Sequence, residues 1–318
     1  MTDDEKQALT GRTFYKAKQE ASFAEAQAHS KAKAYDLVVE NGRVMDPETG
    51  ADRIANLGIS KGKIAAISKA RMSGKRRIDA KGLVVAPGFI DLHSHGQDPF
   101  GYDQQVRDGV TTALELEAGV YPVVPFYAAR EGKTRINYGA SVGIQGIRTT
   151  IKTGIRDDTR MSSPAVIVRK AEWAETPFTR AERDRERAMF REEFAAGGLG
   201  MGVNYEYLPA LARDEFYELM QDASALRAPV FVHVRASTRA DVDNLMPPMQ
   251  EMIADAASTG ATVHVCHIGS KSLSAVGPVL DILPLADPGD AGAVLDAVVR
   301  QHDETFHLTT LTSAAGEL

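Results

Sequence analysis

Between residues 35 and 86, apolar and polar residues alternate in short segments, and this pattern predicts β-strands. YDLVVENGRVMD and NLGISKGKIAAIS both have the two-residue period of a strand. Asn41-Gly42 and Lys61-Gly62 are turn-forming pairs that should interrupt the strands. No segment of this region has the 3.6-residue period of an amphipathic helix. We therefore expect a small β-subdomain at residues 35–86.

Beyond residue 87 apolar runs alternate with amphipathic segments, which predicts strands separated by helices. Thr179 and Glu182 form a capping-box sequence before a charged helix that should end at Gly197-Gly198. A further helix is expected from residue 240 to residue 260. This alternation indicates parallel βαβ units. The six predicted strands lie at residues 87–92, 110–117, 136–143, 199–204, 229–234 and 261–267.

The two ends of the chain do not follow this alternation. Residues 1–34 are rich in Ala, Lys, Glu and Gln, which predicts a polar extension that is helical or disordered. Pro284, Pro288 and Gly289 interrupt the pattern near the other end, and we expect residues 281–318 to form a divergent tail. Residues 87–280 would then form the α/β domain.

Charge and composition exclude several classes of protein. The net charge of −6 leaves no basic excess for a nucleic acid or an anionic membrane. No apolar run approaches the roughly 20 residues of a membrane span, and the first residues lack the apolar run of a signal peptide. Cys266 is the single cysteine, so no intrachain disulfide is possible. We expect a soluble, cytoplasmic protein that acts on a small molecule, and its oligomeric state stays open.

Four histidines stand at the ends of predicted strands. His93 and His95 are two residues apart in PGFIDLHSHG, so they project from one face of a strand and can chelate one divalent metal ion. His233 ends APVFVHV, and His267 ends ATVHVCHI. Active sites of parallel barrels lie at the carboxyl ends of the strands. The four histidines therefore predict a metal site. By alternation from His267, His264 should face the surrounding helices, and Cys266 should be a buried small residue.

The motif VVAPGFIDLHSHG resembles the amidohydrolase superfamily. DGVTTALELEAG, GLGMGVNYEYLP, HVRAS and CHIGSK are most similar to its N-acyl-D-amino-acid deacylases, including the N-acyl-D-glutamate deacylases. The resemblance covers about residues 35–280. It implies an α/β fold, a distorted (β/α)8 barrel of the TIM type with a small amino-terminal β-subdomain, and one or two zinc ions. Because only six strands are recognisable before residue 281, we expect an incomplete barrel.

The resemblance also implies roles for the metal ligands. His93 and His95 would hold one metal ion, and the two later histidines would hold a second. Relatives bridge the two ions with a carboxylated lysine, a glutamate or a cysteine. No lysine ends the fourth strand, and the second strand ends in Glu117, which is the candidate bridge. Glu115 lies one pleat deeper on the same face and is expected to support a ligand.

Substrate contacts and the general base follow from the same resemblance. The substrate of a D-amino-acid deacylase has a free carboxylate, which requires a cation near the metals. Arg235 and Lys271 are the candidates, and Tyr205 and Tyr207 could flank the acyl or side-chain pocket. The family's general base is an aspartate at the end of the eighth strand. Asp281 has the most strand-like surroundings, but no aspartate of the tail ends a convincing strand.

These features predict a zinc-dependent amidohydrolase that acts on carbon–nitrogen bonds other than peptide bonds. The leading hypothesis is deacylation of an N-acyl-D-amino acid by a metal-bound hydroxide. The first alternative is a cyclic-amide hydrolase of the dihydroorotase or hydantoinase kind, against which the absence of a fourth-strand lysine argues. The second is a metal-binding pseudoenzyme or truncated product without turnover, which the missing eighth-strand aspartate favours.

Overall fold

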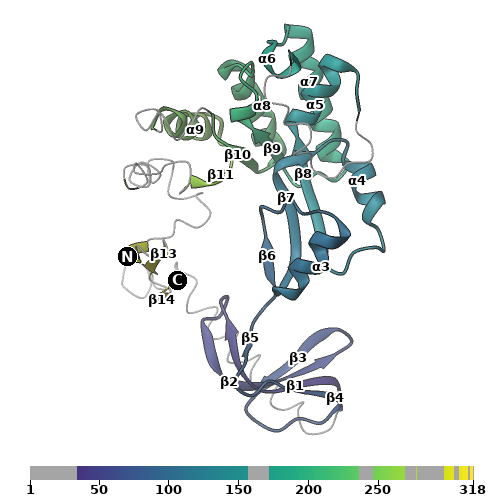
Figure 1. Ribbon diagram of the computed structural model, residues 1–318, viewed down its shortest axis with the longest axis vertical. Coiled ribbons are helices and arrows are strands. Elements are labelled where there is room, and N and C mark those ends of the chain that lie inside the picture. Colours follow the sequence, from purple (N-terminus) through teal and green to yellow (C-terminus); the bar gives the residue numbers. More distant parts are fainter. Residues whose placement is uncertain are drawn as a thin grey trace, which may run out of the picture. The chain divides into compact units, whose positions relative to one another are not determined.

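A computed structural model describes residues 34–156, 172–235 and 246–268, position 277, and residues 297–303, 308–313 and 316–317. The chain divides into two compact units between Pro87 and Gly88 (Figure 1). No helix among the described residues is long and apolar enough to cross a membrane. Each unit has its own sheet and its own buried hydrophobic cluster.

The first unit is a five-stranded sheet in the order β3-β2-β1-β4, with β5 paired to β1. Lys61 and Gly62 have positive φ angles and form the predicted tight turn between β2 and β3. The turn predicted at Asn41-Gly42 is wrong, because β1 continues through it with a register shift between Val39 and Gly42. The strands are β1 (Tyr35–Asp46), β2 (Ala51–Ser60), β3 (Lys63–Ser68), β4 (Gly74–Asp79) and β5 (Val84–Val85).

The second unit contains a curled sheet of six parallel strands that follow one another in chain order, from β6 at one edge to β11 at the other. This sheet is a half-barrel. Its strands are β6 (Phe89–Asp91), β7 (Val110–Val120), β8 (Asn137–Gly143), β9 (Met201–Asn204), β10 (Val230–His233) and β11 (Val263–Val265). Each of them overlaps one of the six segments predicted from the sequence.

Helices between the strands bury one face of this sheet. They are α3 (Pro99–Arg107), α4 (Val123–Arg130), α5 (Ile144–Thr153), α6 (Glu172–Glu175), α7 (Arg180–Ala195), α8 (Arg213–Leu226) and α9 (Met246–Thr259). The capping box at the start of α7 is confirmed, because Thr179 accepts from the backbone of Glu182 and the Glu182 side chain accepts from the backbone of Thr179. The helix ends at Ala195, just before the predicted Gly197-Gly198.

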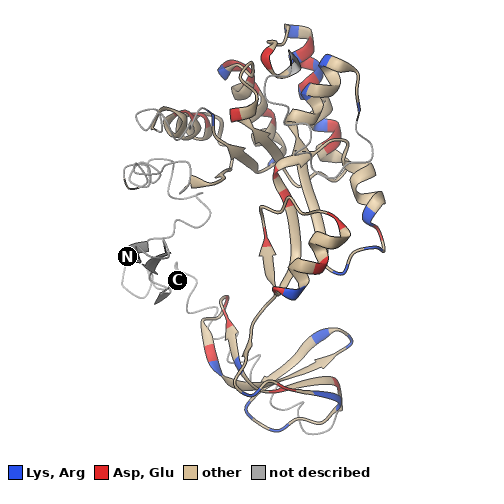
Figure 2. Cartoon of the chain, in the orientation of Figure 1, with Lys and Arg blue, Asp and Glu red and all other residues tan. Residues whose placement is uncertain are grey.

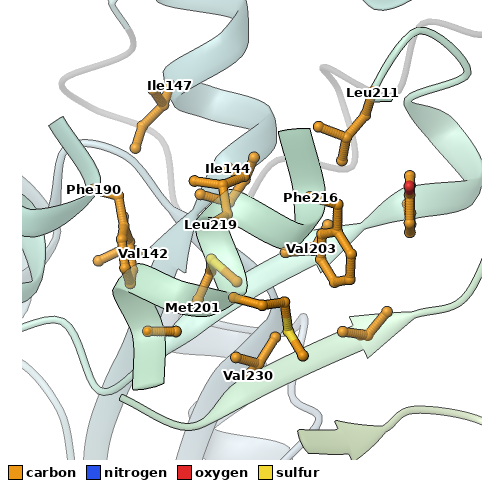
Figure 3. Close-up of a cluster of buried hydrophobic side chains, with 14 of the residues drawn as sticks. Val142, Ile144, Ile147, Phe190, Met201, Val203, Leu211, Phe216, Leu219 and Val230 are labelled. Atoms are coloured by element: carbon orange, nitrogen blue, oxygen red, sulfur yellow. The ribbon is translucent and has the colours of Figure 1, made fainter. Parts of the chain in front are cut away.

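The main hydrophobic core lies between these helices and the sheet. Val203 and Val230 point from β9 and β10 toward Phe216 and Leu219 of α8 (Figure 3). Because side chains of a strand alternate between faces, the intervening residues point away from the helices. We call this second side the inner face of the sheet.

A separate antiparallel sheet has the strand order β12-β13-β14. Its strands are β12 (Ala297–Asp303), β13 (Leu308–Ser313) and β14 (Gly316–Glu317). It lies within residues 281–318, which the sequence predicts to diverge from the strand–helix alternation.

Candidate metal centre

The candidate site begins with a bulge near the carboxyl end of β7. The pairing of β7 with β8 steps from Glu115–Ala140 to Val120–Val142, so five residue steps on β7 face two on β8. A bulge of this kind bends a strand and changes where its side chains point. Glu117 lies inside it and is buried. In Figure 2 the acidic residues of β7 stand out in red within a largely uncharged sheet.

Close backbone packing holds the bulge in place. The Ser141 hydroxyl donates to the Leu116 carbonyl oxygen at 2.6 Å. Gly202 of β9 lies against the same segment, where a Cβ atom would come within 2.7 Å of the carbonyl oxygens of Leu116 and Glu117. Gly119 has a φ of 62°, a conformation that glycine adopts without strain. Glycine is therefore required at position 119, two residues after Glu117, and at position 202 of the strand β9 that packs against it.

The Glu117 carboxylate lies among all four predicted histidines. Its Oε2 atom is 3.2 Å from Nε2 of His93 and 3.2 Å from Nε2 of His95. Its Oε1 atom is 2.6 Å from Nδ1 of His233 and also contacts Nε2 of His267. Each carboxylate oxygen thus faces one pair of histidines.

The four histidines come from three strand ends. His93 and His95 follow β6, His233 is the last residue of β10, and His267 lies in a turn after β11 with a φ of 55°. Two groups of potential ligand atoms result, with all atoms of a group within 4.8 Å of one another. Imidazole nitrogen and carboxylate oxygen are ordinary zinc ligands. The residues therefore fit the divalent metal that the sequence predicts, with Glu117 common to both groups.

Two further carboxylates hold the outer nitrogens of two histidines. Nδ1 of His95 lies 2.9 and 3.1 Å from the oxygens of Glu115, which is fully buried. Nε2 of His233 lies 2.7 Å from Oε2 of Glu206. Such partners fix the ring orientation of metal-binding histidines. The position of Glu115 agrees with its expected supporting role, whereas sequence reasoning missed Glu206, which lies in the short 3-10 helix η1 (Tyr205–Tyr207) after β9.

The contacts between the carboxylates and the histidines shift the pKa values of both kinds of group. Burial would raise the pKa of Glu117, but hydrogen bonds with His233, His93 and His95 outweigh it and hold that pKa far below its ordinary value. Hydrogen bonds to Glu115 and Glu117 raise the pKa of His95 to about 10. Two buried carboxylates thus require neighbouring positive charge, which protonated histidines or divalent cations can supply.

A polar network holds the loop that contains the first two histidines. The backbone N–H of His93 donates to Asp91 Oδ1 at 3.0 Å. Gln97 Nε2 donates to the Ser94 carbonyl oxygen at 3.1 Å, and Arg130 in turn donates to the Gln97 carbonyl oxygen at 2.8 Å. Gln97 and Arg130 are buried. The loop is therefore anchored to α4 as well as to its own strand.

The predicted substrate residues occupy different positions. The ring of Tyr207 lies 5.0 Å from that of His233, beside the candidate site. Tyr205 is buried in the core, and the guanidinium of Arg235 lies 3.7 Å above its ring. Nε of Arg235 is 3.0 Å from Oε2 of Glu251, which lies on α9. These contacts direct Arg235 and Tyr205 toward the helical side.

Two other predicted residues, Lys271 and Asp281, lie outside the described residues. The expectation for His264 is wrong. It aligns with Phe231, and their rings are 5.8 Å apart, whereas the flanking Val263 and Val265 pack on the main core. His264 therefore faces the inner side of the sheet. The strand ends at Val265, so alternation counted back from the turn residue His267 does not apply.

Cys266 is buried at 2% exposure, as the sequence predicts. Burial, together with the nearby charge of Glu117, raises the pKa of its thiol to about 12. The thiol therefore stays protonated at neutral pH and is a poor nucleophile.

Comparison with known protein families gives a match that covers most of the parallel sheet. A sequence model described as "Amidohydrolase family" matches residues 84–262, more than half of the chain. A dihydroorotase from Streptococcus pneumoniae serotype 4 is 41% identical over 94 residues, 29% of this chain and 22% of that protein. An allantoinase from Enterococcus faecalis is 28% identical over 264 residues, 74% of this chain and 54% of that protein. The chain thus spans about half the length, or less, of these relatives.

Solved structures with a similar fold include two deacylases. An N-acyl-D-glutamate deacylase from Bordetella bronchiseptica, complexed with zinc and a phosphonate inhibitor, matches 78% of this chain and 56% of its own at 23% identity, with a TM-score of 0.60. A D-aminoacylase matches 73% of this chain and 51% of its own at 22% identity, with a TM-score of 0.56. At these identities the likeness extends to the fold alone.

Proposed function

Because the chain belongs to the amidohydrolase family, whose sequence model matches residues 84–262, we propose that it is a zinc-dependent hydrolase of linear amides. Its substrate would be an N-acyl-D-amino acid, from which it removes the acyl group. The observation that supports this most directly is the Glu117 carboxylate, whose two oxygens face two separate pairs of histidines. This arrangement suits two metal ions that share one bridging anion.

The roles of the surrounding residues follow from their contacts. The four histidines and Glu117 would hold the metal. A bound divalent metal supplies Lewis-acid polarisation of the amide carbonyl and activates water for attack. Glu115 and Glu206 fix the rings of His95 and His233 through the nitrogens that face away from Glu117. These contacts would hold the two rings in place for metal binding.

Substrate recognition would use residues around this cluster. Tyr207, whose ring lies beside His233, would flank the acyl or side-chain pocket. Lys271 would bind the substrate carboxylate, and Asp281 would act as the general base. The contacts of Arg235 and Tyr205 with Glu251 favour a supporting role for both residues over direct contact with substrate.

Hydrolysis of a cyclic amide is the second candidate. The curated relatives named above, a dihydroorotase and an allantoinase, favour it. The end of β9 argues for the linear substrate, because Asn204 stands there and no lysine is present to form a carboxylated bridge. Glu117 of β7, whose carboxylate contacts all four histidines, would form the bridge instead.

Turnover assays with matched substrates separate the two candidates. The zinc-reconstituted protein is assayed on N-acetyl-D-amino acids, beginning with N-acetyl-D-glutamate, on the L-enantiomers, and on dihydroorotate and allantoin. We expect release of acetate from the D-compounds, its loss after chelation of zinc, and its loss in Glu117→Gln. Turnover of the cyclic amides alone would establish the second candidate. Turnover of no compound by fully zinc-loaded protein would refute both.

A further inference from the structure

The side chain of Asn204 lies on the inner face of the sheet, next to the candidate metal centre. Asn204 ends β9 and is aligned with His233, the last residue of β10. Aligned residues of neighbouring parallel strands project to the same face. Val203, immediately before Asn204, points into the core under the helices, and Gly202 lies against the backbone of Glu117. Asn204 is thus one pleat beyond the Glu117 segment and beside His233.

The amide oxygen of Asn204 has no hydrogen-bond partner in the described part of the chain. The residue is 2% exposed, and its Oδ1 atom is buried. Both ring nitrogens of His233 already have partners, Nδ1 with Glu117 and Nε2 with Glu206. The two carboxylates are themselves acceptors. A buried acceptor without a donor is unfavourable in a folded protein, and it marks a place where a ligand can supply the missing hydrogen.

We propose that Asn204 binds the N–H of the scissile amide through Oδ1, and so selects amides over esters. This inference rests on the proposed function, since a linear secondary amide presents an N–H at the bond that is cleaved. The position suits the role, because Asn204 and the ligand His233 are neighbours on one face. An ester of the same shape has an oxygen at this point and leaves Oδ1 without a donor.

The test compares an amide with its matching ester in three variants. N-acetyl-D-glutamate and O-acetyl-D-2-hydroxyglutarate differ only in the N–H. Asn204→Leu removes the acceptor, and Asn204→Asp keeps an oxygen at its position. Asn137→Leu is the matched control, because Asn137 is exposed at the opposite end of the neighbouring strand β8. Asn204→Ser replaces the leucine variant if the latter does not fold. The zinc content of each protein is measured alongside.

We expect Asn204→Leu to lower kcat/KM for the amide about three- to tenfold, the usual worth of one neutral hydrogen bond. In Asn204→Leu, kcat/KM for the ester and the zinc content should change less than about twofold. The control Asn137→Leu should change kcat/KM for the amide by no more than the same factor. Equal losses for amide and ester, or a loss of zinc that explains both, would overturn the proposal.

A binding measurement separates this inference from the proposed function. Calorimetric titration of the zinc-free protein should show tighter binding of the amide than of the ester in the wild type, by a similar factor, and no difference in Asn204→Leu. If the zinc-loaded wild type hydrolyses none of the N-acetyl-D-amino acids, the proposed function fails, and the titration alone decides the role of Asn204. An equal affinity of the wild type for both compounds would refute it.

Discussion

A methyl group added at Gly202 should damage the candidate metal centre without touching any of the side chains proposed as metal ligands. The new Cβ atom of Gly202→Ala would lie 2.7 Å from the carbonyl oxygens of Leu116 and Glu117, and it would also meet the Ser141 hydroxyl. The hydroxyl can rotate away, but the two carbonyls belong to the backbone of the bulge. Ordinary contact begins at 3.4 Å, so the bulge or β9 must move by about 0.7 Å, the difference between the two distances.

The size of the effect follows from this displacement. Overpacking of a filled interior costs about 1–3 kcal/mol, and the reduced freedom of the unfolded chain on replacing glycine offsets about 0.4–1 kcal/mol of it. We expect a net loss of about 1–2 kcal/mol in the free energy of unfolding. Metal sites tolerate shifts of only about 0.2 Å in ligand distance. Because Glu117 moves with the bulge, zinc affinity should fall about ten- to a hundredfold, as when a ligand loses its orienting partner.

Two measurements test this reasoning. Chemical denaturation of the zinc-free protein gives the stability change, and competition with a fluorescent chelator gives the zinc affinity. Gly277→Ala is the control, since a methyl group there would meet no atom of the described residues within 4 Å. Ser141→Ala combined with Gly202→Ala should not restore zinc binding, because both carbonyl contacts persist. Wild-type zinc affinity and stability in Gly202→Ala would show that the packing of Gly202 against the bulge does not position Glu117.

Four further substitutions test carboxylates individually. Glu117→Gln should lower the zinc stoichiometry, because the charge shared by both groups of candidate ligands is lost. Glu115→Gln should mainly alter thermal stability. The reverse pattern in metal analysis would indicate that Glu115, and not Glu117, is the bridging carboxylate. Glu206→Gln should weaken zinc binding about ten- to a hundredfold through loss of its contact with a ligand, and unchanged affinity would contradict this. Burial and the neighbouring Glu215 raise the pKa of Glu186, so stability should decline as pH rises above its ordinary pKa of 4.5. Glu186→Gln should flatten that decline in melting curves from pH 5 to 8, and an unchanged slope would argue against it.

Much of the parallel sheet could be predicted because its signals are local. Each strand is a short apolar run bounded by turn residues, and the charged helix α7 begins at a capping box read directly from Thr179 and Glu182. The errors came where local signals have two structural meanings. Asn41-Gly42 can form a turn or a bulge, and pairing with β2 stabilises the bulge. His267 ends an apolar run in the sequence, but a turn separates it from the strand.

The candidate site could be predicted only in part, for the same reason. His-x-His spacing and histidines at strand ends indicate where imidazoles gather, because parallel strands end at one edge. No local sequence signal indicates that β7 has a bulge of three extra residues. This bulge places the Glu117 side chain in contact with His233, which lies three strands away on β10. Glu206 was missed because it follows β9 in a short helix, where alternation no longer assigns a face.

Three residues at and just after the carboxyl end of β9 lie beside His233, at the strand end where some relatives have a bridging lysine. Asn204 aligns with His233, Glu206 holds its Nε2 atom, and the ring of Tyr207 lies against its imidazole. Tyr205, between them, turns into the core and anchors the segment. Resemblance to the wider family implies that some members use this strand end for a carboxylated lysine. Here Glu206, just beyond the end of β9, holds the His233 ring, and Glu117 of β7 is the proposed bridge in place of a lysine.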